Sequence, residues 1–341
     1  MNYSETLTRL IERHDLPFAE MRELMEHIMG GQLTPAQIAA VLIALRTKGE
    51  TVTEIAASAS VMRELSTKVK VKHSGHLVDT CGTGGDSMQT FNISTTSAFV
   101  AAAAGAHVAK HGGRSVSSTC GSADVLEKLG VNVGLSADQV AQCVDQIGVG
   151  FMFAPNHHSA MKHAAPVRRE LGVRTLFNLL GPLTNPAGAQ NQVIGVFHQS
   201  LTAKLAQVLG ELGSRHVLVV HGADGMDEIS ISEGTYIAEL KDGKVSEYTV
   251  HPDLFGLPSA PINMLRVANV EEACEKLLGV LNNEVGVPRD IVQLNAGAAI
   301  YVAGLTDTLE EGVEKADQVI ASGAAKSKLD QLIALSNSLM A

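Results

Sequence analysis

The feature that most constrains the fold is a regular alternation of short apolar runs with segments that begin at Ser or Thr, starting near residue 76. Strand–helix alternation at this spacing is typical of βα units, which build a mostly parallel sheet. Two later runs flank Asp242-Gly243, a dipeptide typical of a tight antiparallel hairpin. The predicted strands span residues 76–79, 107–110, 148–154, 193–197, 216–220, 235–239 and 245–250, and the predicted helices between them span residues 94–104, 122–129, 136–147 and 200–212.

The N-terminal segment, up to about residue 70, predicts helices only. Thr34-Pro35 is typical of an N-cap followed by proline in the first helical turn. Thr51 and Glu54 have the spacing of a capping box, ahead of a helix that ends near Leu65. We therefore expect an α/β protein with a small helical domain at residues 1–72, with a contribution from about 168–188, and a larger α/β domain with a mostly parallel central sheet at residues 73–341.

The predicted N-terminal helices carry more apolar surface than a small helical layer can bury alone. We therefore expect them to pack on another element or on a second subunit, and we predict a homodimer that uses these helices. The apolar stripe that indicates this consists of Ile38, Val41, Leu42 and Leu45.

Composition excludes several classes of protein. The chain has 341 residues and 45% hydrophobic residues, enough for two domains with a sizeable core. Its formal net charge of −10 argues against general binding to nucleic acid or to a membrane surface. The four cysteines are far apart and fit reduced thiols better than disulfides or a zinc site. With no signal-peptide pattern and no apolar run long enough to span a bilayer, we expect a cytoplasmic protein.

A glycine-rich loop lies between the first predicted strand and the helix near Ser94. It reads DTCGTGGD at residues 79–86 and continues to NIST at residues 92–95. Glycines let the main chain approach an oxygen-rich ligand, and a helix N-terminus attracts anions. Asp86 suits a ribose hydroxyl or a metal ion, while Asn92, Ser94 and Thr95 could donate to phosphate. The alternative is an ordinary glycine-rich turn that Ser94 caps.

A second loop reads KHGGRSVSS at residues 110–118 and also follows a predicted strand, ahead of a helix that we expect Ser122 to cap. Its two cations, two glycines and three serines suit a second anion site, although a solvated surface loop would have a similar composition. Both loops follow strands of one parallel sheet, so both should lie at its carboxyl edge, where ligands of such sheets bind. Together the two loops favour a ligand with two phosphate groups.

Two further segments carry charge suited to such a ligand. Arg168 or Arg169 could bind a carboxylate with two hydrogen bonds, or could instead pair with Glu170 or Glu64 at the surface. Asp227-Glu228 follows a predicted strand, and adjacent carboxylates in such a place suit Mg²⁺ held through phosphates. Asp224-Gly225 could be a simple turn. His157-His158 lack the spacing of a helical zinc pair.

Taken in order, these motifs resemble those of the anthranilate phosphoribosyltransferases, enzymes of tryptophan biosynthesis. The resemblance extends over most of residues 76–230, and the flanking helices match in layout. It implies a nucleoside-phosphorylase-like phosphoribosyltransferase fold. The motifs that carry it are DTCGTGGD, NIST, KHGGRSVSS, GSAD, HAAPVRRELGVRTLFNLLGPLTNP and DGMDE.

The resemblance also implies roles for individual residues. Arg168 would face the carboxylate of anthranilate, with Gly82, His111 and Gly113 lining its path. Two Mg²⁺ ions per monomer would be coordinated by Ser94, Asp227 and Glu228. Phosphoribosyl pyrophosphate would be bound by Gly82, Gly85, Asp86, Thr90, Asn92, Ile93, Ser94, Thr95, Lys110, His111, Gly112, Gly113, Arg114, Ser115, Val116, Ser117, Ser118 and Ser122.

One position departs from the family pattern. The family usually has KHGNR where this chain has Gly113 in place of the asparagine, which puts its affinity for anthranilate in doubt. Two other functions remain open. A pyrimidine nucleoside phosphorylase shares this plan but would lack the acidic pair for a pyrophosphate-bound metal, and a non-catalytic nucleic-acid-binding relative would need a basic groove.

Overall fold

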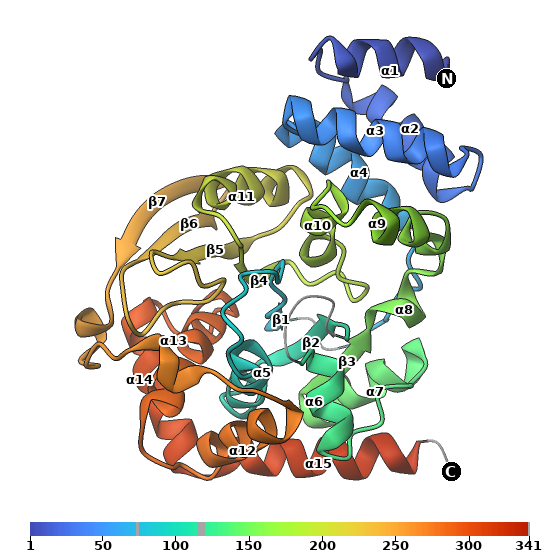
Figure 1. The fold of residues 1–341 in the computed structure, drawn as a ribbon. Helices are drawn as coiled ribbons and strands as arrows, with labels where there is room; N and C mark the ends of the chain where they lie inside the picture. Colours follow the sequence, from blue (N-terminus) through green and yellow to red (C-terminus); the bar gives the residue numbers. More distant parts are fainter. Residues whose placement is uncertain (73–74, 115–119, 340–341) are drawn as a thin grey trace.

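The computed structural model describes residues 1–72, 75–114 and 120–339 (Figure 1). Figure 1 shows a layer of N-terminal helices at one end, the sheet with the C-terminal helices at the other, and the short helices near residues 165–180 between them. Four residues predicted to bind phosphoribosyl pyrophosphate lie outside the described residues. These are Ser115, Val116, Ser117 and Ser118.

The central sheet has seven strands in the order β3-β2-β1-β4-β5-β6-β7. The first five strands run parallel, and β6 and β7 are antiparallel. At the hairpin between β6 and β7, Asp242 and Gly243 both have positive φ, at 51° and 73°. The predicted mostly parallel sheet is thereby confirmed. The strands are β1 Leu77–Asp79, β2 His107–Gly112, β3 Val149–Phe153, β4 Asn191–Gly195, β5 His216–Gly222, β6 Thr235–Lys241 and β7 Lys244–Val250.

The N-terminal layer consists of α1 (Tyr3–Ile11), α2 (Phe18–Met29), α3 (Pro35–Lys48) and α4 (Val52–Leu65). Both predicted starts are confirmed. Thr34 caps α3 in a capping box with Gln37, and Thr51 caps α4 in a capping box with Glu54.

Of three predicted helix starts in the α/β part, one has the predicted N-cap residue and two do not. Ser136 caps its helix as predicted. Ser122 does not cap, because it is the first residue of its helix and Gly121 precedes it as the N-cap. Ser94 does not cap either, since the N-cap there is Asn92. The helices of this part are α5 Ile93–Ala103, α6 Ser122–Lys128, α7 Ala137–Ile147, α8 Ala154–His157, α9 Ala165–Leu171, α10 Phe177–Leu180, α11 Thr202–Glu211, α12 Val270–Leu281, α13 Val287–Val302, α14 Leu309–Ala321 and α15 Ala324–Ser338.

The helix predicted from residue 200 also starts later. Residues Gln199–Leu201 form a 3₁₀ turn, and α11 begins at Thr202. The C-terminal helices α12–α15 and α5 share one apolar core with one face of the sheet. No helix in the described ranges is long and apolar enough to cross a bilayer. All four cysteines are free thiols, as expected.

A second apolar core joins the N-terminal helices to α9, α10, α11 and the other face of β4–β6. This core buries the whole predicted stripe, with Ile38 only 1% exposed and Val41, Leu42 and Leu45 fully buried. The expectation that the stripe packs on another element is therefore confirmed, because α9 and neighbouring segments cover it, and the stripe is not available to a second subunit. The domain division near residue 72 stays a prediction.

β4 ends at a point of very close main-chain packing. A Cβ atom added at Gly195 would lie 1.5 Å from the carbonyl oxygen of Asp227. On the other side, a Cβ at Gly82 would lie 2.9 Å from the carbonyl oxygen of Gly195. The loops after β1 and β5 therefore approach β4 only because these positions are glycine.

We expect Gly195→Ala to lower the free energy of unfolding by about 3 kcal/mol, because the added methyl group overlaps a main-chain carbonyl. Chemical denaturation followed by circular dichroism measures the change. Gly210→Ala in α11 is the matched control, since its Cβ would lie 3.5 Å from Leu240, an ordinary contact. The control should leave stability unchanged or raise it by up to about 1 kcal/mol. Equal stability of both variants would mean that the Asp227 loop can move away from β4 at no cost.

Candidate active site

β1 and β2 are parallel neighbours, so the glycine loop and the start of the second loop lie at one carboxyl edge of the sheet, as the sequence predicts, and the segment after β5 lies at the same edge. The glycine loop is anchored on both sides. The N–H of Thr83 donates to the carbonyl of Gly195 at 2.8 Å, and the N–H of Phe91 donates to the carbonyl of Leu265 at 3.0 Å. Between these anchors, positive φ values bend the chain sharply. The loop residues with positive φ are Gly84, Gly85, Ser87 and Gln89.

Lys110 lies at the centre of this edge. Its side chain is 4% exposed, and its ammonium group donates to the carbonyl of Thr80 at 2.7 Å and to the hydroxyl of Ser94 at 3.3 Å. The first contact ties β2 to the glycine loop, and the second ties β2 to the first turn of α5. One buried cation thus joins the two loops that the sequence predicted to meet.

The acidic pair after β5 lies against the same turn. The carboxylate of Glu228 accepts a hydrogen bond from the N–H of Ser94 at 3.2 Å. The N–H of Asp227 donates to the carboxylate of Asp86 at 3.4 Å. Three carboxylates from two loops therefore gather near the α5 N-terminus.

Burial raises the pKa of Glu228 to about 7, although Lys110 opposes the shift. Burial first, and then repulsion from Asp86 and Glu228, raises the pKa of Asp227 well above its usual value. A divalent cation would relieve both effects. Within the described ranges, no three His, Cys, Asp or Glu side chains converge on one metal position. A cation here would therefore need hydroxyl or ligand oxygens as well, and such oxygen donors suit Mg²⁺.

Asp79, at the end of β1, is a buried acid that the sequence reasoning did not select. Its carboxylate accepts from the N–H of His111 at 3.1 Å and from the side-chain amide of Asn185 at 2.7 Å. Burial raises its pKa to about 6, and Lys110 again opposes the shift. Asp79 thereby fixes the end of β2. An aspartate at the end of an apolar strand was the signal available in the sequence.

His111 faces His158, with 3.2 Å between their Nε2 atoms. Burial and the neighbouring His158 lower the pKa of His111 to about 3, and burial and His157 lower the pKa of His158 to about 4. Both imidazoles are neutral at physiological pH, so this wall of the site adds no positive charge.

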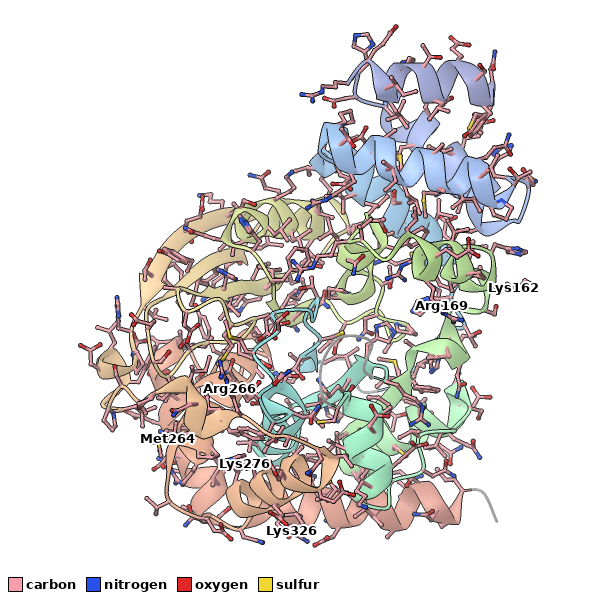
Figure 2. All side chains as sticks on the ribbon, viewed as in Figure 1. Lys162, Arg169, Met264, Arg266, Lys276 and Lys326 are labelled. Carbon is pink, nitrogen blue, oxygen red and sulfur yellow. The ribbon has the colours of Figure 1, made fainter. Side chains whose placement is uncertain are left out.

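Arg168 lies on α9 with its guanidinium 5.5 Å from the ring centre of Phe177. Among the described residues it forms no ion pair, and burial lowers its pKa. Arg169 is exposed (Figure 2). The alternative of an ion pair with Glu64 is not realised, because Glu64 binds Arg22 at 2.6 Å. Arg168 is thus a half-buried cation suited to an anionic ligand.

Three other residues predicted to bind phosphoribosyl pyrophosphate have side chains that are already paired or buried. Arg114 is held by Asp124 at 2.9 Å and Glu127 at 2.6 Å, so its cation already has acidic partners on α6. Ile93 and Thr95 are 1% exposed, so their side chains point into the protein.

Smaller contacts hold parts of both loops. The hydroxyl of Ser122 donates to the carbonyl of Gly113 at 3.4 Å, and a Cβ at Gly112 would lie 2.3 Å from that hydroxyl. Asn92 contacts the carbonyl of Cys120 at 3.4 Å, and Thr90 forms a β-bridge with Arg266.

Family comparisons agree with this geometry. Residues 74–326 match the family described as "Glycosyl transferase family, a/b domain", and residues 4–66 match its helical bundle domain. The chain is 59% identical to anthranilate phosphoribosyltransferase of Laribacter hongkongensis over 100% of both chains. It is 62% identical to that of Thiobacillus denitrificans over 97% of both.

Solved structures agree as well. The Thermus thermophilus anthranilate phosphoribosyltransferase superposes with a TM-score of 0.93 at 42% identity, covering 99% of this chain and 100% of that one. The Saccharomyces cerevisiae enzyme, in complex with PRPP and Mg, superposes with a TM-score of 0.88 at 25% identity over 98% of both chains. The chain described here belongs to the anthranilate phosphoribosyltransferase family.

Proposed function

We propose that the carboxyl edge of the sheet transfers the phosphoribosyl group of 5-phosphoribosyl 1-pyrophosphate to the amine of anthranilate, releasing pyrophosphate. The observation that carries this is the meeting of both anion-type loops with Asp227-Glu228 around the buried Lys110. Anthranilate is fluorescent, so loss of its emission on addition of phosphoribosyl pyrophosphate tests the activity. The two alternatives, a nucleoside phosphorylase and a nucleic-acid-binding protein, are not favoured by the relatives of this chain.

In this proposal phosphoribosyl pyrophosphate lies along the glycine loop and the end of β2. Gly82, Gly85 and Asp86 would bind through the loop, and Ser94 through the first turn of α5. The second loop would bind phosphoribosyl pyrophosphate through residues 110–114. Support comes from Lys110, whose contacts hold both loops in register.

Anthranilate would bind between the glycine loop and α9, with its carboxylate on Arg168. The support is charge: Arg168 is half-buried and has no acidic partner among the residues described. His111 and Gly82 would line the ring, and the neutral state of His111 suits an aromatic surface.

The chemistry needs positioning and charge more than a protein nucleophile. The bond from ribose C1 to pyrophosphate breaks with its electron pair on the leaving oxygen, and the amine lone pair forms the new C1–N bond. The aromatic amine is unprotonated at neutral pH, so its proton can pass to solvent after attack. Lys110 and the main-chain N–H groups of the loops stabilise negative charge on the substrate. Mg²⁺, when bound, would neutralise charge on the departing pyrophosphate.

The finer proposal for the metal is two Mg²⁺ per monomer, held by Ser94, Asp227 and Glu228 together with substrate oxygens. The all-oxygen donor set and the raised pKa values of both acids support it. We expect excess chelator to abolish turnover, because without a cation the buried carboxylates repel the pyrophosphate, and added Mg²⁺ to restore it. The fluorescence assay measures both steps. Undiminished activity in chelator would contradict the proposal.

Arg168→Ala should raise the KM for anthranilate about tenfold or more, since a charge-assisted contact contributes roughly 1.5–3 kcal/mol. The KM for phosphoribosyl pyrophosphate should change far less. Arg169→Ala is the matched control, because this neighbour is exposed, and both of its KM values should stay within about twofold of wild type. Equal effects of Arg168→Ala on both substrates would assign the residue a structural role.

Gly113→Asn should lower the KM for anthranilate about threefold, with kcat within about twofold, because the amide can add one neutral hydrogen bond and the loop loses freedom. No described atom lies within 4 Å of a Cβ at Gly113, and its φ is not positive, so asparagine fits without strain. Steady-state kinetics of the single variant decide the question. An unchanged or higher KM would mean that the pocket is adapted to glycine.

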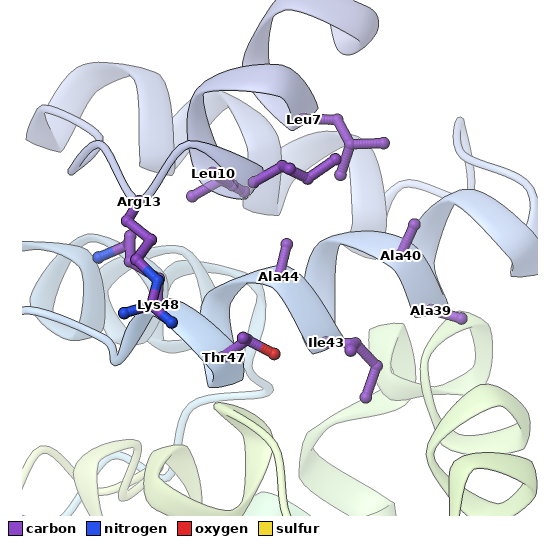
Figure 3. A pocket seen from close by; sticks show the side chains of 10 residues that line it. Leu7, Leu10, Arg13, Ala39, Ala40, Ile43, Ala44, Thr47 and Lys48 are labelled. Atoms are coloured by element: carbon purple, nitrogen blue, oxygen red, sulfur yellow. The ribbon is translucent and has the colours of Figure 1, made fainter.

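We also propose that the chain forms a homodimer through α1 and α3. Leu7, Ala40 and Ile43 line an apolar cavity of about 440 Å³ between these helices (Figure 3). Ile11 and Ile43 are 66% and 38% exposed there. Light scattering at micromolar concentration should give the dimer mass. Ile11→Glu with Ile43→Glu should give the monomer, since charges cannot be buried in such a contact. A monomeric wild type would refute this.

A further inference from the structure

Arg174, between α9 and α10, contacts the glycine loop although it belongs to the segment that carries Arg168. Its guanidinium donates to the carbonyl of Gly85 and lies 4.1 Å from the ring centre of Phe197. The residue is exposed and forms no ion pair with a described acid. A surface arginine with an acidic partner would only add charge pairing, whereas this one joins three segments of the site.

The contact at Gly85 has a direct consequence for the loop. In a trans peptide the carbonyl of one residue and the N–H of the next point in opposite directions. Because the Arg174 guanidinium donates to the Gly85 carbonyl, the N–H of Asp86 points away from Arg174. Gly84 and Gly85 both have positive φ, at 65° and 85°, so without this contact the peptide would have unusual freedom to rotate.

The neighbouring contacts hold the loop from the opposite side. The carboxylate of Asp86 accepts from the N–H of Asp227 at 3.4 Å, and the N–H of Phe197 donates to the hydroxyl of Thr83 at 3.2 Å. Phe197 thus supports the loop through its backbone and supports Arg174 through its ring. The loop is held between the acidic pair after β5 and a guanidinium from the α9 side.

We infer that Arg174 is a positioning residue that fixes the Gly85–Asp86 peptide for binding phosphoribosyl pyrophosphate, and that Phe197 acts with it by supporting the guanidinium. The inference rests on the proposed function. Arg174 links the segment that would bind anthranilate to the loop that would bind phosphoribosyl pyrophosphate. The alternative is that Arg174 itself contacts a phosphate, and the test separates the two.

Calorimetric titration of the Mg²⁺ complex of phosphoribosyl pyrophosphate into the full chain measures donor binding without turnover. We expect Arg174→Ala to raise its Kd about three- to tenfold, the effect of losing one exposed charge-assisted hydrogen bond. Phe197→Leu should raise it by a similar factor. The double variant should be no weaker than the weaker single variant, because both changes remove one arrangement.

Arg174→Lys distinguishes positioning from direct contact. An ammonium group cannot lie flat on the ring while it donates to the carbonyl, so lysine should leave the defect in place. Arg169→Ala, an exposed arginine earlier in the same segment, is the control and should bind like wild type. The KM for anthranilate in Arg174→Ala should stay within about twofold of wild type, while that for the donor follows its Kd.

Three results would overturn the inference: unchanged Kd in Arg174→Ala, full rescue by lysine, or additive effects of Arg174→Ala and Phe197→Leu. The last two would instead indicate a direct contact with phosphate. Failure of the proposed function is separately visible, since the wild type would then bind the donor without consuming anthranilate, or would not bind it at all.

Discussion

The buried ammonium group of Lys110 is the contact on which the rest of the site depends. It holds the glycine loop at Thr80 and the first turn of α5 at Ser94. Burial raises the pKa of Asp79 and of Glu228, and the charge of Lys110 keeps both increases smaller than they would otherwise be. A cation buried this deeply needs oxygen partners, because burying it without them is costly. Thr80 and Ser94 join β2 to the segment after β1, and Ser94 also binds Glu228 from the segment after β5. The contacts that satisfy the buried cation therefore also assemble the site.

Close main-chain packing completes this edge. Gly82, Gly195 and the carbonyl of Asp227 stack so closely that side chains are excluded. Because of this packing, the acidic pair after β5 lies beside the loop after β1, although the two are more than a hundred residues apart in the sequence. The edge therefore has positive charge from Lys110 and three carboxylates within one small volume. That balance suits a polyanionic ligand that brings its own cations.

The two apolar cores explain how this edge is connected to the N-terminal helices. One core holds the C-terminal helices on the sheet, and the other extends from the opposite face through α9, α10 and α11 into α1–α4. Arg168 and Arg174 both come from the segment between these parts. A movement of the helical layer would therefore displace Arg168. Through the contact of Arg174 with Gly85, it would also displace the glycine loop. In this arrangement Arg168 and the glycine loop are connected through one segment of the chain.

Local patterns in the sequence determined the helix starts at Thr34 and Thr51, the parallel sheet, the hairpin at Asp242-Gly243 and the meeting of the two loops. These follow from capping chemistry, from φ preferences and from the rule that parallel strands share one carboxyl edge. Only the tertiary structure decided that the stripe around Val41 is covered within the chain, that Arg114 is held by acids, and that Asp79, Gly195 and Arg174 support the site. Each of these depends on contacts between residues of different elements, and local pattern carries no information about such contacts.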